Sequence, residues 1–351
     1  MVSKPKSISD KDVERKIQDM FGIDISGIPI KDLKRYLNEG ITEDRLNKYR
    51  TALAYSIGVI AVREDIKEKV IVSIDGRDAA GKGSNISRVT KDLDIKKYGV
   101  KAFNKPTKEE RYENEWFNRY KHFFPDLNRD DFFIRFFDRS WYNRSGVEAA
   151  MGFCSIEEYN YFMDNVIPFE LREIYKKEFK HIKVYLSVTK EIQKERLDRR
   201  NKLIRKRWKS SPIDKVAPEK RNDYTLAKFL TLSRTDHENS PWIVLDSNYK
   251  FLSSIEIMKA IIATNDRLLE IVQNDLDINL SPNSKIRRTA HEELILMRNS
   301  GDLDKAAKKR GLDIDDVLNP DNIDRVFDFR QEGEESGKKK KVKKSKKEVK
   351  K

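Results

Sequence analysis

Short β-branched segments alternate with longer segments of helical periodicity along most of this chain, and this alternation constrains the fold more than any other feature. The segments with strand character are KVIVSID (69–75), VKAFN (100–104), FFIRFFD (132–138), HIKVYLSV (181–188) and PWIVLDSN (241–248). Strands that alternate with helices form a parallel sheet covered on both faces. The sequence therefore predicts an α/β fold built on a doubly wound parallel sheet.

Segments of different character flank the predicted sheet, which we place in residues 66–275. Residues 1–65 show helical periodicity and predict an N-terminal helical segment. Residues 276–329 predict a C-terminal extension that is partly helical and begins with a linker at 278–288. Residues 330–351 are rich in Gly and Glu and then in Lys, so we expect them to form a disordered tail.

The composition excludes a membrane span and favours the cytoplasm. No stretch reaches the roughly eighteen consecutive apolar residues that a membrane helix needs. The N-terminal MVSKPKSISDKDVERKI has no apolar core after its lysines, as a secretory signal would. The single cysteine, Cys154, cannot form an internal disulfide, which suits a reducing compartment. We therefore expect a cytoplasmic protein with no membrane partner.

The net charge of +14 is concentrated in two segments. Residues 338–351 carry +9 and residues 196–221 carry +8, which leaves −3 for the rest of the chain. The tail has a simple alternative explanation as a solvated, solubilising end. The internal cluster lies within predicted folded chain, so it indicates a polyanionic ligand.

A glycine-rich turn, GRDAAGKGS (76–84), follows the first predicted strand and opens a helix. Glycines let successive backbone N–H groups point inward and bind an anion at a helix N-terminus, while Lys82 reaches the terminal phosphates. This context indicates a P-loop. Its expected nucleotide- and phosphate-binding residues are Gly76, Arg77, Ala79, Ala80, Gly81, Gly83 and Ser84.

Two positions in this loop bear on metal binding. Gly83 stands where a P-loop usually has the Ser or Thr that binds Mg²⁺, and Ser84 comes one position late, so another group has to hold the metal. Asp78 is an unusual residue beside phosphates unless a cation bridges them. The alternative for Asp78 is a turn residue that caps the loop.

A second carboxylate is predicted at the same edge of the sheet. The strand FFIRFFD ends at Asp138, as a Walker-B strand ends in an acid, and Arg139 and Arg144 follow it. Carboxyl ends of parallel strands gather at one edge, so Asp138 should lie near Lys82. Asp78 and Asp138 could then share Mg²⁺, or Mn²⁺ in its place, and the arginines could bind phosphate oxygens. The alternative is that Asp138 caps the next helix and Arg144 forms a surface ion pair.

The basic segment at about 196–224 has the position of a lid. In small-molecule phosphotransferases of this architecture, such a segment closes arginines over the transferring phosphate. It holds more positive charge than one nucleotide needs, and an extended polyanion would explain the surplus. RNA is disfavoured because Trp208 alone is available for base stacking. The expected lid residues are Arg196, Arg199, Arg200, Arg205, Lys206 and Lys209.

Six motifs together resemble the polyphosphate kinase 2 family. They are GRDAAGKGS (76–84), NKPTKEE (104–110), FFDRSWYNRSGVE (136–148), MGFCS (151–155), KRWKSSPID (206–214) and SPWIVLDSNYK (240–250). The resemblance runs from about residue 30 to 270 and keeps the motif order of the family. Within it, FDRSWYNR is similar to the class that acts on nucleoside diphosphates, and Gly83 follows the pattern of the family.

The resemblance implies a P-loop kinase fold with a helical lid. It also implies Mg²⁺-dependent, reversible phosphoryl transfer between inorganic polyphosphate and ADP or GDP, by a homo-oligomer that is a dimer or tetramer. By matching position it implies roles for Asp78, Lys82, Asp138, Arg139 and Arg144, and for lid residues that include Arg200, Lys206 and Lys209. Two alternatives stay open at this point, a P-loop nucleoside or nucleotide kinase that uses ATP alone and a non-catalytic binder of RNA or another polyanion.

Overall fold

A computed structural model describes residues 30–62, 69–126, 133–202, 216 and 219–329. Within these residues, six strands form one sheet in the order β2-β3-β1-β4-β5-β6. The first five strands are parallel to their neighbours, and β6 pairs antiparallel with β5. The strands are β1 (Val70–Gly76), β2 (Tyr98–Ala102), β3 (Ile134–Asp138), β4 (Lys180–Ser187), β5 (Trp242–Asp246) and β6 (Arg287–Thr289).

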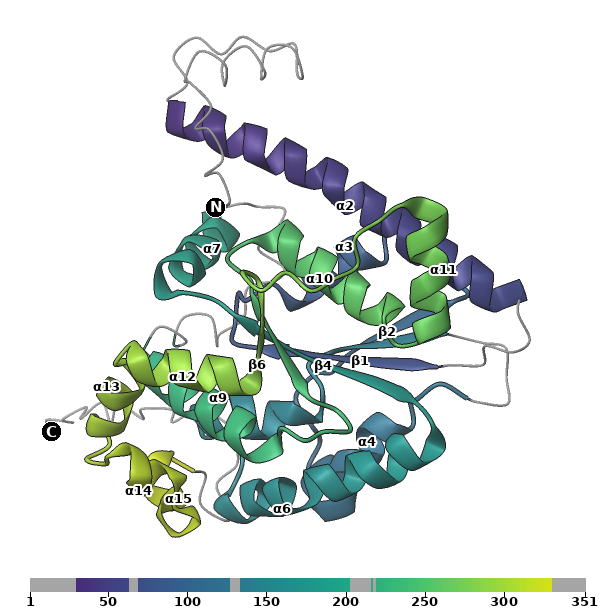
Figure 1. The fold of residues 1–351 in the computed structure, drawn as a ribbon. Coiled ribbons are helices and arrows are strands. Elements are labelled where there is room, and N and C mark those ends of the chain that lie inside the picture. Colours follow the sequence, from purple (N-terminus) through teal and green to yellow (C-terminus); the bar gives the residue numbers. More distant parts are fainter. Residues whose placement is uncertain (1–29, 63–68, 127–132, 203–215, 217–218, 330–351) are drawn as a thin grey trace, which may run out of the picture.

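Helices cover both faces of this sheet (Figure 1). One face carries α2 (Ile30–Val62), α3 (Lys82–Val89), α10 (Lys250–Ile262) and α11 (Asp266–Leu276), and the other carries α4 (Glu113–Lys121), α6 (Ile156–Glu173) and α9 (Arg221–Thr235). Alternate residues of β1 supply the two cores, because Val70, Val72 and Ile74 pack on one side and Ile71 on the other. The predicted doubly wound α/β fold is confirmed.

The winding of the chain reverses at β1, and this places the site. β2 and β3 lie on one side of β1, and β4 and β5 lie on the other. The segments that follow β1, β3, β4 and β5 therefore emerge together at the carboxyl edge of the sheet, where ligands bind in folds of this class. The helix α7 (Lys190–Lys202) follows β4 at this edge.

The C-terminal extension packs onto the sheet and onto α9. It contributes β6, α12 (Ala290–Asn299), α13 (Asp302–Lys308), α14 (Ile314–Leu318) and α15 (Ile323–Val326), and these helices share an apolar core with α9. The linker predicted at 278–288 therefore ends inside a strand. β6 has no apolar residue that would have predicted a strand, since it consists of Arg287, Arg288 and Thr289, and all three are half-buried or exposed.

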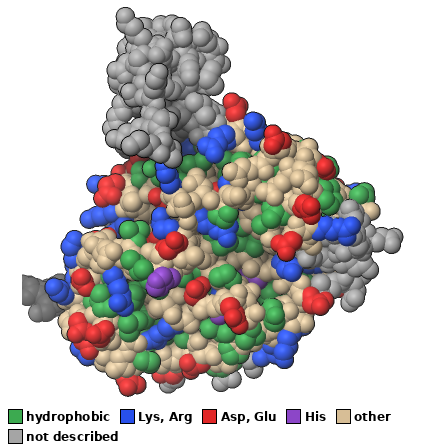
Figure 2. All heavy atoms as spheres, in the orientation of Figure 1, with side chains coloured by type: hydrophobic (Ala, Val, Ile, Leu, Met, Phe, Trp, Pro, Cys, Tyr) green, Lys and Arg blue, Asp and Glu red, His purple; other side chains and the backbone are tan. Residues whose placement is uncertain are grey.

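Several predicted segments lie outside the described residues. These are residues 1–29, the central part of the predicted lid at 203–215 with Arg205, Lys206 and Lys209, and the tail at 330–351. On the face drawn in Figure 2, Lys and Arg side chains are intermingled with Asp and Glu side chains, in keeping with the nearly balanced charge of the chain outside the two basic segments. No helix in the described part of the chain has the length and apolar character to cross a membrane.

Candidate active site

The loop of residues 76–81 connects β1 to α3 and depends on two glycines. Gly76 and Gly81 have φ values of 140° and 103°, which side chains rarely tolerate. A Cβ at Gly76 would also lie 2.7 Å from the carbonyl oxygen of Leu186 on β4. The chain can therefore leave the centre of the sheet in a tight turn and enter α3 at Lys82.

All six carbonyl oxygens of this loop accept hydrogen bonds from the surrounding protein. Lys82 Nζ donates to residues 76 and 77, Gln193 Nε2 to residue 78, the Arg196 guanidinium to residues 79 and 80, and Asn85 Nδ2 to residue 81. The negative ends of these peptide dipoles are thus already engaged. The first N–H groups of α3 have no acceptor within the helix and remain suited to an anion.

Lys82 lies buried between the loop and three carboxylates. Its Nζ is 2.6 Å from the Gly76 oxygen and 3.2 Å from the Arg77 oxygen. Burial and the positive charge of Arg139 lower the pKa of Lys82, and the charges of Asp78, Asp138 and Asp75 act in the opposite direction. The ammonium group therefore has carboxylate neighbours that keep a positive charge in place beside the loop.

Asp78 pairs with residues from two other parts of the chain. Its Oδ1 is 3.3 Å from Arg139 NH2, and its Oδ2 accepts a hydrogen bond of 2.9 Å from the Tyr224 hydroxyl on α9. Arg139 itself adopts a left-handed conformation with φ of 69°, which is uncommon outside glycine and occurs at functional sites. Asp78 is therefore not a cap of the loop, and the structure brings it together with Arg139.

Asp138 ends β3 beside α3, and Gly83 makes room for it. A Cβ at position 83 would lie 2.8 Å from Asp138 Oδ2. Among the described residues, the half-buried Asp138 carboxylate has no hydrogen-bond or ion-pair partner. The cap of the next helical turn, Trp141–Asn143, is Ser140 instead. Gly83, which lacks the usual hydroxyl, thus lets a carboxylate approach the N-terminus of α3.

Asp75 is a third carboxylate at this edge, and the sequence reasoning missed it. It is buried at the end of β1 and accepts hydrogen bonds from Ser140 N (3.3 Å) and Ser140 Oγ (2.5 Å). Burial raises the pKa of Asp75 to about 6, while the Ser140 hydrogen bonds and the charge of Lys82 partly oppose this shift. Asp75 thereby ties the segment after β3 to the end of β1. A signal was available, since KVIVSID ends in this aspartate.

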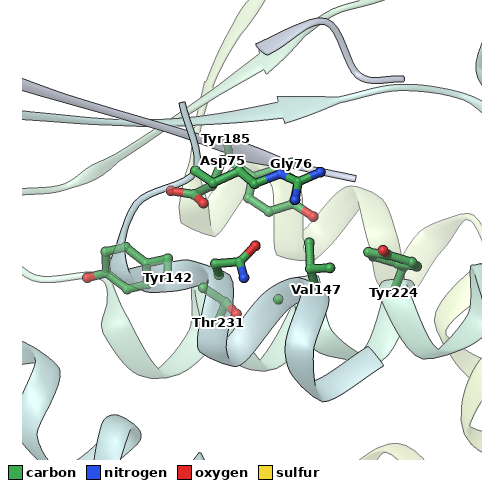
Figure 3. A pocket seen from close by; sticks show the side chains of 10 residues that line it. Asp75, Gly76, Tyr142, Val147, Tyr185, Tyr224 and Thr231 are labelled. Atoms are coloured by element: carbon green, nitrogen blue, oxygen red, sulfur yellow. The ribbon is translucent and has the colours of Figure 1, made fainter. Parts of the chain in front are cut away.

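A pocket opens next to these charged groups. Figure 3 shows Asp75 and Tyr185 on one side of it and Tyr142, Val147, Tyr224 and Thr231 on the other; Gly76, Arg139, Asn143 and Gly146 complete the lining. The hydroxyl of Tyr142, one of the lining residues, accepts a hydrogen bond of 3.1 Å from buried Lys183, which also pairs with Glu170 at 3.1 Å. The lining thus combines tyrosine rings and Val147 with polar side chains that include Asp75 and Arg139.

Arg144 is not brought into this group, contrary to the sequence prediction. Its guanidinium pairs with Glu148 and Glu158, each at 3.1 Å, and lies 4.0 Å over the Trp116 ring. The side chain is 1% exposed, so this is a buried ion pair and not a surface one. The physical reason is the helical turn Arg144–Glu148, in which residue 148 follows at helical spacing and captures the guanidinium.

The predicted lid residues in the described part of the chain take different positions. Arg196 binds the loop carbonyls and also donates to the Ser247 oxygen at 2.5 Å, so it braces the loop against the segment after β5. Arg199 is exposed on α7 and Arg200 is half-buried. In the loop itself, the Arg77 side chain turns toward α9, where it reaches Thr225 Oγ1 at 3.5 Å, and Ser84 is exposed.

Gln193, Ser247 and Tyr224 are further residues of the site that the sequence reasoning missed. Gln193 and Arg196 are three residues apart on α7 and so project from one side of the helix toward the loop. Ser247 follows β5 directly and donates to the Ala80 oxygen at 2.5 Å. The position of Ser247 after a strand was a usable signal, whereas Tyr224 lies far from the loop in sequence.

Comparison with known proteins identifies the family. The sequence profile described as polyphosphate kinase 2 (PPK2) matches residues 40–270. The chain belongs to the polyphosphate kinase 2 family. The resemblance noted in the sequence motifs is thereby confirmed, and the site described above lies within the matched residues.

Curated relatives of this polyphosphate kinase 2 chain carry names that differ in the nucleotide. The chain is 38% identical over 204 residues to an NDP-polyphosphate phosphotransferase 2 of Ruegeria pomeroyi, which covers 58% of this chain and 57% of that protein. It is 37% identical over 214 residues to a GDP-polyphosphate phosphotransferase of Pseudomonas aeruginosa (60% and 58%). It is 36% identical over 210 residues to an ADP-polyphosphate phosphotransferase 2 of Rhizobium meliloti (59% and 66%). These matches span less than two thirds of each relative.

Solved structures agree on the fold. A crystal structure of polyphosphate kinase 2 from Arthrobacter aurescens TC1 aligns with a TM-score of 0.56 at 23% identity and covers 73% of this chain and 86% of that chain. A crystal structure from Pseudomonas aeruginosa PA01 aligns with a TM-score of 0.57 at 26% identity and covers 73% and 51%. The extension after residue 270 lies beyond the matched family profile.

Proposed function

We propose that this protein is an Mg²⁺-dependent phosphotransferase that moves a phosphoryl group reversibly between inorganic polyphosphate and a nucleoside diphosphate, ADP or GDP. The observation that carries the proposal is the gathering of Lys82, Asp78, Asp138 and Arg139 at a loop whose six carbonyl oxygens all accept hydrogen bonds from side chains, Lys82 among them. The names of the relatives support the substrate class.

In the proposed reaction, a terminal oxygen of the diphosphate forms a bond to the last phosphorus of the polyphosphate, and the bond from that phosphorus to the shortened chain breaks. The attacking oxygen is already ionised at neutral pH, so no strong base is required. The protein contributes positioning and neutralisation of charge. Lys82 and Arg139 supply positive charge at the loop, and Asp78, fixed by Arg139 and Tyr224, orients the acceptor.

Asp138 fits the role of a magnesium ligand better than Asp78. Its carboxylate is half-buried beside the loop and has no partner among the described residues, whereas both oxygens of Asp78 are engaged. No three His, Cys, Asp or Glu side chains in the described ranges form a cluster that would hold a metal alone. Mg²⁺ bound through one or two carboxylates and substrate phosphates requires no such cluster. Bound there, the ion would neutralise phosphate charge.

One assay separates this proposal from the two alternatives. The full chain is incubated with Mg²⁺, ADP and polyphosphate, and ATP is followed over time. We expect ATP only when polyphosphate is present. Transfer from ATP to a nucleoside or nucleotide without polyphosphate would identify an ATP-dependent kinase, and no transfer together with tight RNA binding would identify a polyanion binder. Repeating the assay with GDP gives the nucleotide preference, and light scattering gives the proposed dimer or tetramer.

Replacing Gly83 by alanine should separate activity from stability. The added Cβ would meet Asp138 Oδ2 at 2.8 Å and displace that carboxylate, so we expect a loss of about tenfold to a hundredfold in kcat. Alanine within a helix is favourable by up to about 1 kcal/mol relative to glycine, so Tm should not fall. Gly58→Ala is the matched control, because a Cβ at that position in α2 meets nothing within 4 Å. Unchanged turnover in Gly83→Ala would contradict the role of Asp138.

A further inference from the structure

The helix α9 lies between the phosphate loop and the C-terminal extension. On the loop side, the Tyr224 hydroxyl donates to Asp78 Oδ2 at 2.9 Å. Arg221 donates to Gln193 Oε1 at 2.8 Å, and Gln193 in turn donates to the Asp78 carbonyl oxygen at 3.0 Å. The first turn of α9 therefore contacts both the side chain and the backbone of Asp78, directly or through one residue.

The opposite side of α9 is packed by the extension. Leu303, Ala306 and Ala307 of α13 belong to the same buried apolar cluster as Leu226, Phe229 and Leu230 of α9, and Figure 1 shows α12 and α13 beside this helix. Polar contacts also join α9 to the extension, since Lys228 pairs with Glu293 of α12 and Arg234 donates to the Leu318 oxygen at 2.7 Å. The position of α9 is thus set jointly by the sheet and by residues outside the matched family profile.

A cluster of four charged residues joins the extension to the first turn of α9. Arg310 contacts Asp223 at 2.8 Å and Asp328 at 2.6 Å, and Lys220 contacts Asp223 at 3.1 Å and Asp328 at 3.2 Å. The side chains of Arg310 and Asp223 are only 20% and 11% exposed, so solvent weakens this pair less than a surface pair. The Arg310 hydrogen bonds lower the pKa of Asp328 to about 2.

The backbone of Asp328 also lies directly against Gly152. A Cβ at Gly152 would lie 2.3 Å from the Asp328 carbonyl oxygen, and Gly152 has a φ of 64°. The end of the extension therefore packs directly on the backbone that follows α5 (Ala149–Met151), and Arg310 joins Asp328 at this end to Asp223. Asp223 immediately precedes Tyr224.

We infer that the C-terminal extension fixes the geometry of the phosphate loop through α9, and that Arg310 is the positioning residue of this contact. Arg310 holds Asp223, Asp223 sets the first turn of α9, and Tyr224 on that turn holds the Asp78 carboxylate. The side-chain hydrogen bonds and ion pairs of Arg310 in the described structure go to Asp223 and Asp328 and to none of the loop residues. The effect on turnover rests on the proposed function.

A double-mutant cycle tests the inference in the full-length protein. The variants are Arg310→Gln, Tyr224→Phe and their combination, assayed for kcat and KM with ADP and polyphosphate. We expect Arg310→Gln to lower kcat about fivefold to tenfold. In the Tyr224→Phe background the same substitution should lower kcat by less than about twofold, because the contact through which Arg310 acts is already lost. A merely structural role would leave the two losses independent.

Two further variants control for general damage. Arg325→Gln is the matched substitution in the same extension, since Arg325 is exposed and contacts Asn322 and the Gly311 oxygen instead of α9; it should keep the parental kcat. Arg310→Lys retains one positive charge without the forked contact, so it should fold even if Arg310→Gln does not, and it should lose less activity. Equal losses in Arg310→Gln and Arg325→Gln would overturn the inference, as would a full Arg310 effect in the Tyr224→Phe background.

Hydrogen exchange at the amides of residues 77–85 gives a readout that needs no turnover. Arg310→Gln, or Arg310→Lys if the former does not fold, should accelerate exchange in this loop several-fold. Arg325→Gln should leave it unchanged, and adding Tyr224→Phe should produce little further acceleration. A parent protein that makes no ATP would overturn the proposed function, and the exchange data would still decide the inference. Unchanged loop exchange in the Arg310 variants would overturn it.

Discussion

Lys82→Ala should lower phosphoryl transfer from polyphosphate to ADP by about a thousandfold while the protein stays folded. A loss of this size is at the upper end of what is seen when one preorganised electrostatic contact is removed. The ammonium group lies buried beside the loop, where burial strengthens its interaction with a transferring phosphate. No other side chain donates to the Gly76 carbonyl oxygen among the hydrogen bonds of the described residues, so the loop loses its anchor as well as its charge. Initial rates of ATP formation measure the loss.

The stability of the same variant separates this role from a structural one. Two loop carbonyls lose their lysine donor, which costs roughly 1–3 kcal/mol of unfolding free energy, but the cost of burying a charge disappears at the same time. We therefore expect Tm to shift by only a few degrees. Lys91→Ala, an exposed lysine just after α3, serves as the control and should retain full activity. A Lys82→Ala protein with a near-normal rate would remove Lys82 from the mechanism.

The strands and the closeness of Asp138 to Lys82 could be predicted because both follow from backbone rules. Apolar runs end in turns, and parallel strands bring their carboxyl ends to one edge, so β1 and β3 begin and end within two residues of the predicted segments. These rules use only the order of residues along each strand. They determine where a Cα lies at the edge of the sheet, and for Asp138 that position was enough to predict that it lies near Lys82.

The directions of the arginine side chains could not be predicted in the same way. Arg144 and Arg196 both have the side chain and the sequence position suited to phosphate binding. In the structure, however, Arg144 pairs with Glu148 and Glu158, and Arg196 donates to the loop carbonyls. A guanidinium group binds whichever acceptor its neighbours leave unsatisfied. That choice depends on contacts between distant segments, as does the placement of Tyr224 on Asp78.

Asp138→Asn should reduce turnover by roughly a hundredfold to a thousandfold, since an amide keeps the shape of the side chain but loses the charge that binds a cation. Among the described residues Asp138 has no hydrogen-bond or ion-pair partner, so the substitution breaks no such contact there, and Tm should stay close to the parental value. Rates measured across a range of Mg²⁺ concentrations test the reason for the loss, because the variant should need more Mg²⁺ for half-maximal activity. Asp164→Asn, an exposed position on α6, is the control. If Asp138→Asn kept the parental rate and the parental Mg²⁺ requirement, the metal would have to be held by other residues. The close approach of Asp138 to position 83 would then have no role in catalysis.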